Sequence, residues 1–133
     1  MTTMASITVK KNDGVTDIVW TGVTASAGDK TPALWRSDTA VGTVGQKPVV
    51  TMSGQSNSNG DVRRINLDGS YPSVYTDSTT SLTSIRSKMR FTGSFAMPQD
   101  ATASDINEFV AQITNLVASP LFKSSIQAGF APV

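Results

Sequence analysis

The spacing of apolar residues changes at Pro98, and no other feature of this sequence constrains its fold as strongly. From Leu82 to Met97 apolar and polar residues alternate over an unusually long run, which is typical of a β-strand with one covered face. After Pro98 the apolar residues recur at the spacing of one face of an α-helix. They are Ile106, Phe109, Val110, Ile113, Leu116 and Val117. The change predicts an α+β fold with antiparallel strands first and helices last.

Turn signals divide the residues before Pro98 into a meander of strands. Residues 5–21 are predicted to form an N-terminal β-hairpin around Asn12-Asp13-Gly14, because these residue types favour tight turns. Further strands are expected at 32–37, 47–55, 62–68, 71–75 and 82–97. The expected connections are loops at 22–31 and around Gly42 and Gly45, turns at 57–60 and 68–70, and a polar tip at 76–81. This order predicts one antiparallel sheet.

Two helices are expected to close the chain. Thr102 or Ser104 can cap the first helix, and acidic residues in its first turn complement the helix dipole. Pro120 is well placed to begin a second, shorter helix that ends near Gly129. Internal repeats and domain linkers are absent from the sequence. We therefore expect a single domain over 1–133, with the hairpin and sheet in 1–97 and the helices in 98–133.

Composition removes several functional classes. The sequence has no cysteine and no histidine, so it lacks disulfides, thiolate ligands and the usual general base. No pair of carboxylates is placed convergently, and we predict neither enzymatic activity nor a cofactor or metal site. The N-terminus does not resemble a secretory signal, and no apolar run approaches the roughly 20 residues of a membrane span. The protein is expected to be soluble and made in a cytoplasm.

Three of the expected strands have one apolar face and one hydrophilic face. The hydrophilic side chains are Thr51, Ser53 and Gln55, then Arg64 and Asn66, then Arg86, Lys88 and Arg90. Cations neutralise phosphates, and hydroxyls and amides bond to phosphate oxygens or base edges, so this pattern predicts a nucleic-acid surface. The turn at 57–60 leaves the register of strand 62–68 open by one residue, and Arg63 is the alternative to Arg64. Solvated strand residues are the other interpretation, and it is weakest for the three cations of strand 82–97, which repel one another without an anion.

The apolar faces of these strands must be covered, and one amphipathic helix covers only part of such a sheet. A meander also leaves two unpaired strand edges, and both problems disappear if two copies pair and exchange helices. We therefore predict a homodimer, with a core of Phe109, Ile113, Leu116 and Phe122. The alternative is that the apolar tail folds back on its own sheet.

Several stretches of the C-terminal part of the chain share one further property. They are the segment Ser104–Phe109, the stretch from Asn115 through Ser119-Pro120 to Phe122, the ending Ala131-Pro132-Val133, and the preceding strand Ile85–Thr92. All of them resemble the coat proteins of single-stranded RNA bacteriophages of the levivirus type. The order of predicted elements is similar over the whole chain.

The resemblance implies homodimers that assemble into an icosahedral shell, with helices outside and the sheet lining the interior. It also implies binding of viral single-stranded RNA, repression of replicase translation through an RNA hairpin, a maturation protein as a partner in the virion, and synthesis in the bacterial host cytoplasm. Family contacts fall on positions that match Thr51, Ser53, Arg86, Lys88 and Arg90. Gln55 stands where the family often has a basic residue. A pilus or tail subunit without RNA binding is the alternative function, and a small glycosidase is a third.

Overall fold

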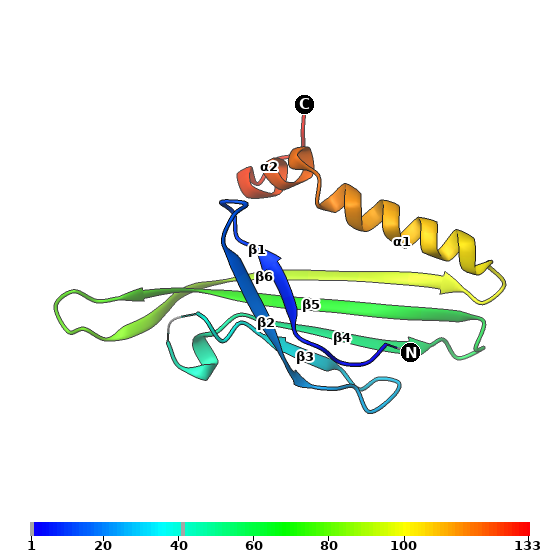
Figure 1. Ribbon diagram of the computed structural model, residues 1–133, viewed down its shortest axis with the longest axis horizontal. Coiled ribbons are helices and arrows are strands. Elements are labelled where there is room, and N and C mark those ends of the chain that lie inside the picture. Colours follow the sequence, from blue (N-terminus) through cyan, green and yellow to red (C-terminus); the bar gives the residue numbers. More distant parts are fainter. Residues whose placement is uncertain (1, 41) are drawn as a thin grey trace. The chain divides into compact units, whose positions relative to one another are not determined.

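A computed structural model describes residues 2–40 and 42–133 of the chain. It contains a six-stranded sheet in the order β1-β2-β3-β4-β5-β6, followed by two helices (Figure 1). The strands are β1 Ile7–Lys10, β2 Asp17–Thr24, β3 Ala33–Arg36, β4 Val49–Ser56, β5 Val62–Thr76 and β6 Thr83–Pro98. A short 3-10 helix, η1, spans Val44–Gln46, and the α-helices are α1 Ala103–Val117 and α2 Pro120–Ala128. The predicted α+β class, with an antiparallel meander before two C-terminal helices, is confirmed.

The N-terminal hairpin β1–β2 closes around the side chain of Asp13. Its carboxylate accepts hydrogen bonds from the backbone N–H groups of Val15 and Thr16, at 2.9 Å each, and from Thr16 Oγ1 at 2.5 Å. These bonds, the Thr16 hydroxyl first, lower the pKa of Asp13 to about 2. Gly14 adopts a φ of 73°, which the turn requires and glycine allows.

The second strand is longer than predicted, which corrects the start of the loop expected at 22–31. Strand β2 continues to Thr24, with a shift of register between Gly22 and Thr24 opposite β3. The N-terminal segment stabilises this part of the sheet, because Trp35 Nε1 donates to the Ala5 carbonyl at 2.8 Å. The remaining loop, residues 25–32, is tied to β4 by a hydrogen bond from the Lys30 N–H to the Gly54 carbonyl, at 2.9 Å.

Strand β5 corrects a second prediction, since the expected break at Asp68-Gly69-Ser70 does not occur. Residues 62–76 form one strand, and Gly69 lies opposite Val50 within the ladder to β4. Pairing with strands on both sides overrides the local turn preference of these residues. Pro72 lies beyond Ser70, the last β5 residue paired with β4, so its missing N–H interrupts no bond of that ladder.

The two helices begin and end where the sequence predicts. Thr102 caps α1 by accepting from the Asp105 N–H at 3.2 Å, Pro120 occupies the first turn of α2, and Gly129 ends it with a φ of 79°. No residue of either helix is buried in the single chain. Within the described residues, no helix is long and apolar enough to cross a membrane.

The chain forms two compact units, Met1–Ala96 and Met97–Val133. Neither unit has a large buried core. Across residues 2–40 and 42–133, the buried positions are Ala33, Ser37, Pro48 and Pro72. Large apolar side chains remain exposed in both units, including Phe91 at 57% in the first and Leu116 at 48% in the second. A single chain therefore leaves much of its apolar surface in water.

Candidate nucleic-acid interface

The register of β4 against β5 decides which polar residues share a face. Thr51 lies opposite Asp68, Ser53 opposite Asn66, and Gln55 opposite Arg64. Directly opposed residues of an antiparallel pair project from the same side of a sheet. The register therefore places Arg64 and Asn66 on the hydrophilic face of Thr51, Ser53 and Gln55. The opposite, apolar face carries Met52 with Leu67 and Gly54 with Ile65.

Arg63, the alternative to Arg64, lies opposite Ser56 on the other face. Its guanidinium donates to both carboxylate oxygens of Asp29, at 2.9 and 3.0 Å, and to Ser56 Oγ at 3.0 Å. The hydrogen bond from Arg63 lowers the pKa of Asp29, and the pKa of Arg63 is raised in turn. Arg63 therefore anchors the 25–32 loop to β5, whereas Arg64 is exposed and makes no ion pair among the described residues.

The alignment of β5 with β6 changes along the two strands. Near their hairpin, Thr76 and Thr83 bring their hydroxyl oxygens within 3.3 Å. If that alignment continued along the strands, Arg90 would lie opposite Gly69, and Phe91 would project from the other face. A Cβ atom built on Gly69, however, lies only 3.8 Å from the Cβ of Phe91, so Phe91 projects from the same face as Gly69. The alignment therefore shifts by one residue between these points, as at a β-bulge. Phe91 shares the apolar face with Gly69, and Arg90 and Thr92 lie on the hydrophilic face.

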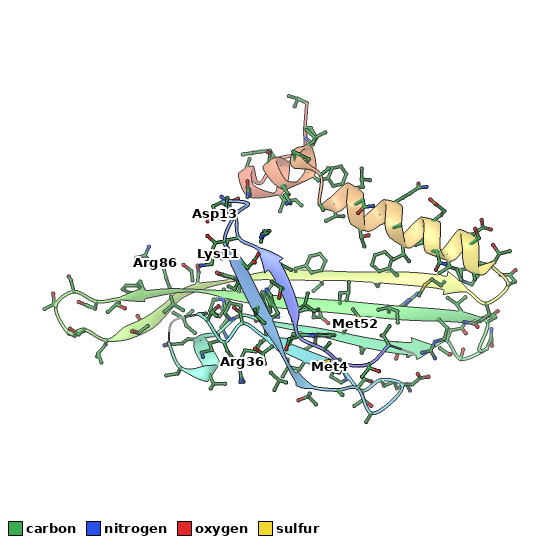
Figure 2. The ribbon with its side chains drawn as sticks, viewed as in Figure 1. Met4, Lys11, Asp13, Arg36, Met52 and Arg86 are labelled. Carbon is green, nitrogen blue, oxygen red and sulfur yellow. The ribbon has the colours of Figure 1, made fainter. Side chains whose placement is uncertain are left out.

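Arg86 lies on β6 between Thr83 and Phe91, the two points that bound this shift. Its guanidinium carbon is 4.8 Å from the centre of the Tyr75 ring, a cation–π contact. Figure 2 labels Arg86 on the ribbon. Alternation along β6 consequently does not by itself place Arg86 with Arg90. The contact gives the Tyr75 ring a partner within the chain. Arg86 and Lys88 are both exposed.

The middle of the hydrophilic face is a shallow polar depression of about 390 Å³. Ser53, Asn66 and Asp68 line it from β4 and β5, and Thr92 and Ser94 line it from β6. Hydroxyl and amide groups of this kind can donate to and accept from phosphates and base edges. Of these five, Ser53 and Asn66 belong to the predicted site. Ser94 was not predicted, although its spacing from Thr92 was the available signal.

The charges of the candidate site differ from those elsewhere in the chain. Lys10 pairs with Asp17 at 2.5 Å, and Arg36 and Lys47 converge on Asp38 at 2.8 and 3.7 Å. The predicted site cations, Arg64, Arg86, Lys88 and Arg90, make no ion pair with a carboxylate of residues 2–40 or 42–133. Asp68 is a carboxylate on the same face. An excess of unpaired positive charge on a polar sheet face favours an anionic partner. Among the described residues, no group of three His, Cys, Asp or Glu side chains could hold a metal ion.

Solved structures share this fold over the full chain length. A subunit of the virus-like particle of bacteriophage NT-214 has a TM-score of 0.82 at 14% identity, with 99% of this chain and 100% of that chain covered. A subunit of the virus-like particle of Beihai levi-like virus 21 has a TM-score of 0.81 at 18% identity, with 99% of this chain and 98% of that chain covered. The capsid protein of bacteriophage GA has a TM-score of 0.72 at 19% identity, with 96% of this chain and 95% of that chain covered. The chain has the coat-protein fold of RNA bacteriophages. The sequence matches no protein-family model and no curated protein.

The coat-protein fold fixes the strand order and the two faces, but it does not fix the side chains on them. At 14–19% identity these structures show the fold alone. The polar and charged groups described above are therefore properties of this sequence.

Proposed function

We propose that this chain is the coat protein of a small RNA bacteriophage, a structural subunit of the virion rather than an enzyme. The observation that carries the proposal is the extent of the structural likeness. Hairpin, sheet and both helices match subunits of virus-like particles, and 98–100% of those subunits is covered. A likeness limited to the sheet would suit many assembling β proteins, whereas this one includes every element in order.

In this proposal the functional unit is a homodimer that assembles into an icosahedral shell. The sheet ends at β6, a strand of 16 residues that would be an open edge in a monomer. Phe109 and Leu116 of α1 and Phe122 of α2 are 46%, 48% and 37% exposed in the single chain. Burying a side chain of this size stabilises by about 1.5–3 kcal/mol, so a few such residues are comparable to a domain's whole stability. A second copy, pairing along β6 and covering these side chains together with Ile113, removes both defects.

The hydrophilic face is proposed to bind the viral single-stranded RNA. Arg64, Lys88 and Arg90 supply charge for phosphates, Thr51, Ser53, Gln55 and Asn66 supply hydrogen bonds, and Arg86 contributes from its place beside Tyr75. Because two copies present this face twice, a dimer can hold an RNA hairpin and repress translation of the replicase. A maturation protein is the further partner in the virion, and synthesis takes place in the cytoplasm of the bacterial host.

Expression of the full chain in bacteria tests this proposal directly. We expect particles with an internal nucleic-acid load, detected by electron microscopy and by the ratio of absorbance at 260 and 280 nm before and after nuclease treatment. Empty filaments or sheets would instead favour a pilus or tail subunit without RNA binding. A small soluble monomer would contradict both assembly functions.

A further inference from the structure

We propose that Arg36 and Lys47, oriented by Asp38, form an additional phosphate-binding point at one end of the hydrophilic face. This inference rests on the RNA-binding function proposed above and extends its surface from β4–β6 to β3. The sequence pattern did not single out these residues, because each is the lone cation of its segment.

The register places Arg36 on the face of the candidate site. Arg36 lies opposite Val49, and its neighbour Leu34 lies opposite Thr51, so these side chains project from the same side. Val49 in turn lies opposite Ser70, and Arg90 is beside Ser70 on the alignment set by Phe91. Arg36, Val49, Ser70 and Arg90 therefore form one row across strands β3 to β6, with Arg36 and Arg90 at its two ends. At about 4.8 Å between neighbouring strands, they are roughly 14 Å apart.

The contacts of Arg36 leave its terminal nitrogens available. Only its Nε donates to Asp38, at 2.8 Å, and neither terminal nitrogen has a partner among the described residues. In the part of the chain that the structure describes, no buried side-chain nitrogen or oxygen lacks a hydrogen bond. Those nitrogens must therefore reach solvent, although the side chain as a whole is only 23% exposed. A guanidinium held through Nε presents its outer edge, which is the geometry that binds a phosphate with two parallel bonds.

Lys47 adds a second charge at the same place. Its ammonium donates to the backbone carbonyl of Asp38 at 3.0 Å and lies 3.7 Å from the carboxylate oxygen that Arg36 also contacts. The hydrogen bond from Arg36 keeps the pKa of Asp38 below its ordinary value, so the carboxylate stays ionised and holds both cations. Two cations share one carboxylate, and one positive charge remains for an anion.

Arg63 shows what an arginine with a purely structural role looks like in this fold. Both of its terminal nitrogens are occupied by Asp29 and Ser56, and it lies on the opposite face. Arg63→Gln is therefore a matched control for Arg36→Gln, since each change removes one arginine charge and one ion pair.

The experiment measures binding of a labelled uridine homopolymer by the purified full-length protein at several salt concentrations. Arg36→Gln should weaken binding several-fold and reduce the slope of log affinity against log salt by about 1. Arg63→Gln should leave that slope unchanged. Asp38→Asn should strengthen binding, because it removes the negative charge that the two cations share, while the amide oxygen of the new side chain can still accept from Arg36 Nε.

The opposite signs of the two substitutions keep the inference testable even if one variant folds poorly. The inference would be overturned if Arg36→Gln kept the wild-type slope of log affinity against log salt. It would also be overturned if Asp38→Asn formed intact particles but bound RNA no more tightly than wild type. If the wild-type protein binds RNA, neither of these two results contradicts the proposed function. A wild-type protein that binds no RNA overturns the proposed function itself.

Discussion

Met52 and Leu67 oppose each other on one face of the β4–β5 pair, and their neighbours Ser53 and Asn66 oppose each other on the other face. The first face is apolar and partly uncovered, with Met52 40% exposed. The second face is polar and carries cations without carboxylate partners. In the single chain, the apolar face lacks a cover and the cations of the polar face lack counter-ions. Another apolar surface can cover the first face, whereas a polyanion can neutralise the second. Side-chain alternation therefore lets one sheet present two surfaces that require different partners.

The largest expected effect comes from placing a charge in the apolar stripe of α1. Ile113→Asp should yield insoluble or unfolded protein, because a buried unpaired carboxylate adds to the about 2–5 kcal/mol lost on truncating a large core side chain. Solubility and circular dichroism measure the outcome. Asn115→Asp adds the same charge to an exposed position of the same helix and should leave the protein folded. A soluble, folded monomer from Ile113→Asp would show that the apolar residues need no second copy.

The β5–β6 tip should affect assembly without affecting either face. Its hydrogen bonds are internal, since the Asp77 carboxylate accepts from the Thr79 and Thr80 N–H groups and the Asp77 carbonyl from the Ser81 N–H. Replacing Asp77–Ser81 with an Asn-Gly turn should therefore preserve folded dimers while abolishing or changing shells. Light scattering and electron microscopy distinguish the two states. Particles of unchanged size would exclude this tip from the contacts between dimers.

The sequence predicted the elements of this fold better than their alignment. Helical spacing after Pro98 and alternation before it are local properties, and both agree with the structure. The break at Asp68-Gly69-Ser70 was wrong because neighbouring strands, not local preference, decide whether a turn-forming sequence stays extended.

The composition of the hydrophilic face depended on alignment in the same way. A slip of one residue exchanges faces, so the choice between Arg63 and Arg64 required the register to β4. The alignment of β5 with β6 likewise shifts between Thr83 and Phe91, so alternation along β6 alone does not decide whether Arg86 shares a face with Arg90. Arg36 was missed for a related reason, since only pairing with β4 brings β3 to this surface.

Lys88→Ala tests whether a cation of β6 contacts RNA. If Lys88 contacts a phosphate, its loss should lower RNA affinity broadly across sequences and reduce the salt slope by about 1. Folding should survive, because Lys88 is exposed on the strand. Hairpin binding at several salt concentrations gives both quantities. Ser53→Ala is the uncharged control, and it should alter which hairpin is preferred while leaving the slope intact. Equal affinity and slope for Lys88→Ala and wild type would make this lysine ordinary surface.

The smallest change should come from the N-terminal hairpin tip, which differs from both faces because the Asp13 carboxylate is hydrogen-bonded within its own turn. Asp13 has a pKa of about 2, and the Thr16 hydroxyl is the largest cause. Thr16→Val should raise this pKa toward the ordinary 3.8 without reaching it, since the Val15 N–H and the backbone N–H of residue 16 still donate. A pH titration of the Asp13 carboxyl carbon by nuclear magnetic resonance measures the change.

The sign of the pH dependence follows from that lowered pKa. A carboxylate whose pKa falls on folding stabilises the folded state above pH 3.8, and this contribution is lost as the pH drops toward 2. Thr16→Val should therefore flatten the loss of stability across that acidic window and leave stability at neutral pH slightly lower. Thr8→Val, on the same hairpin but opposite Val19, is the control and should not move the Asp13 titration. Identical titration curves for wild type and Thr16→Val would mean that the hydroxyl bond does not set the charge of this turn.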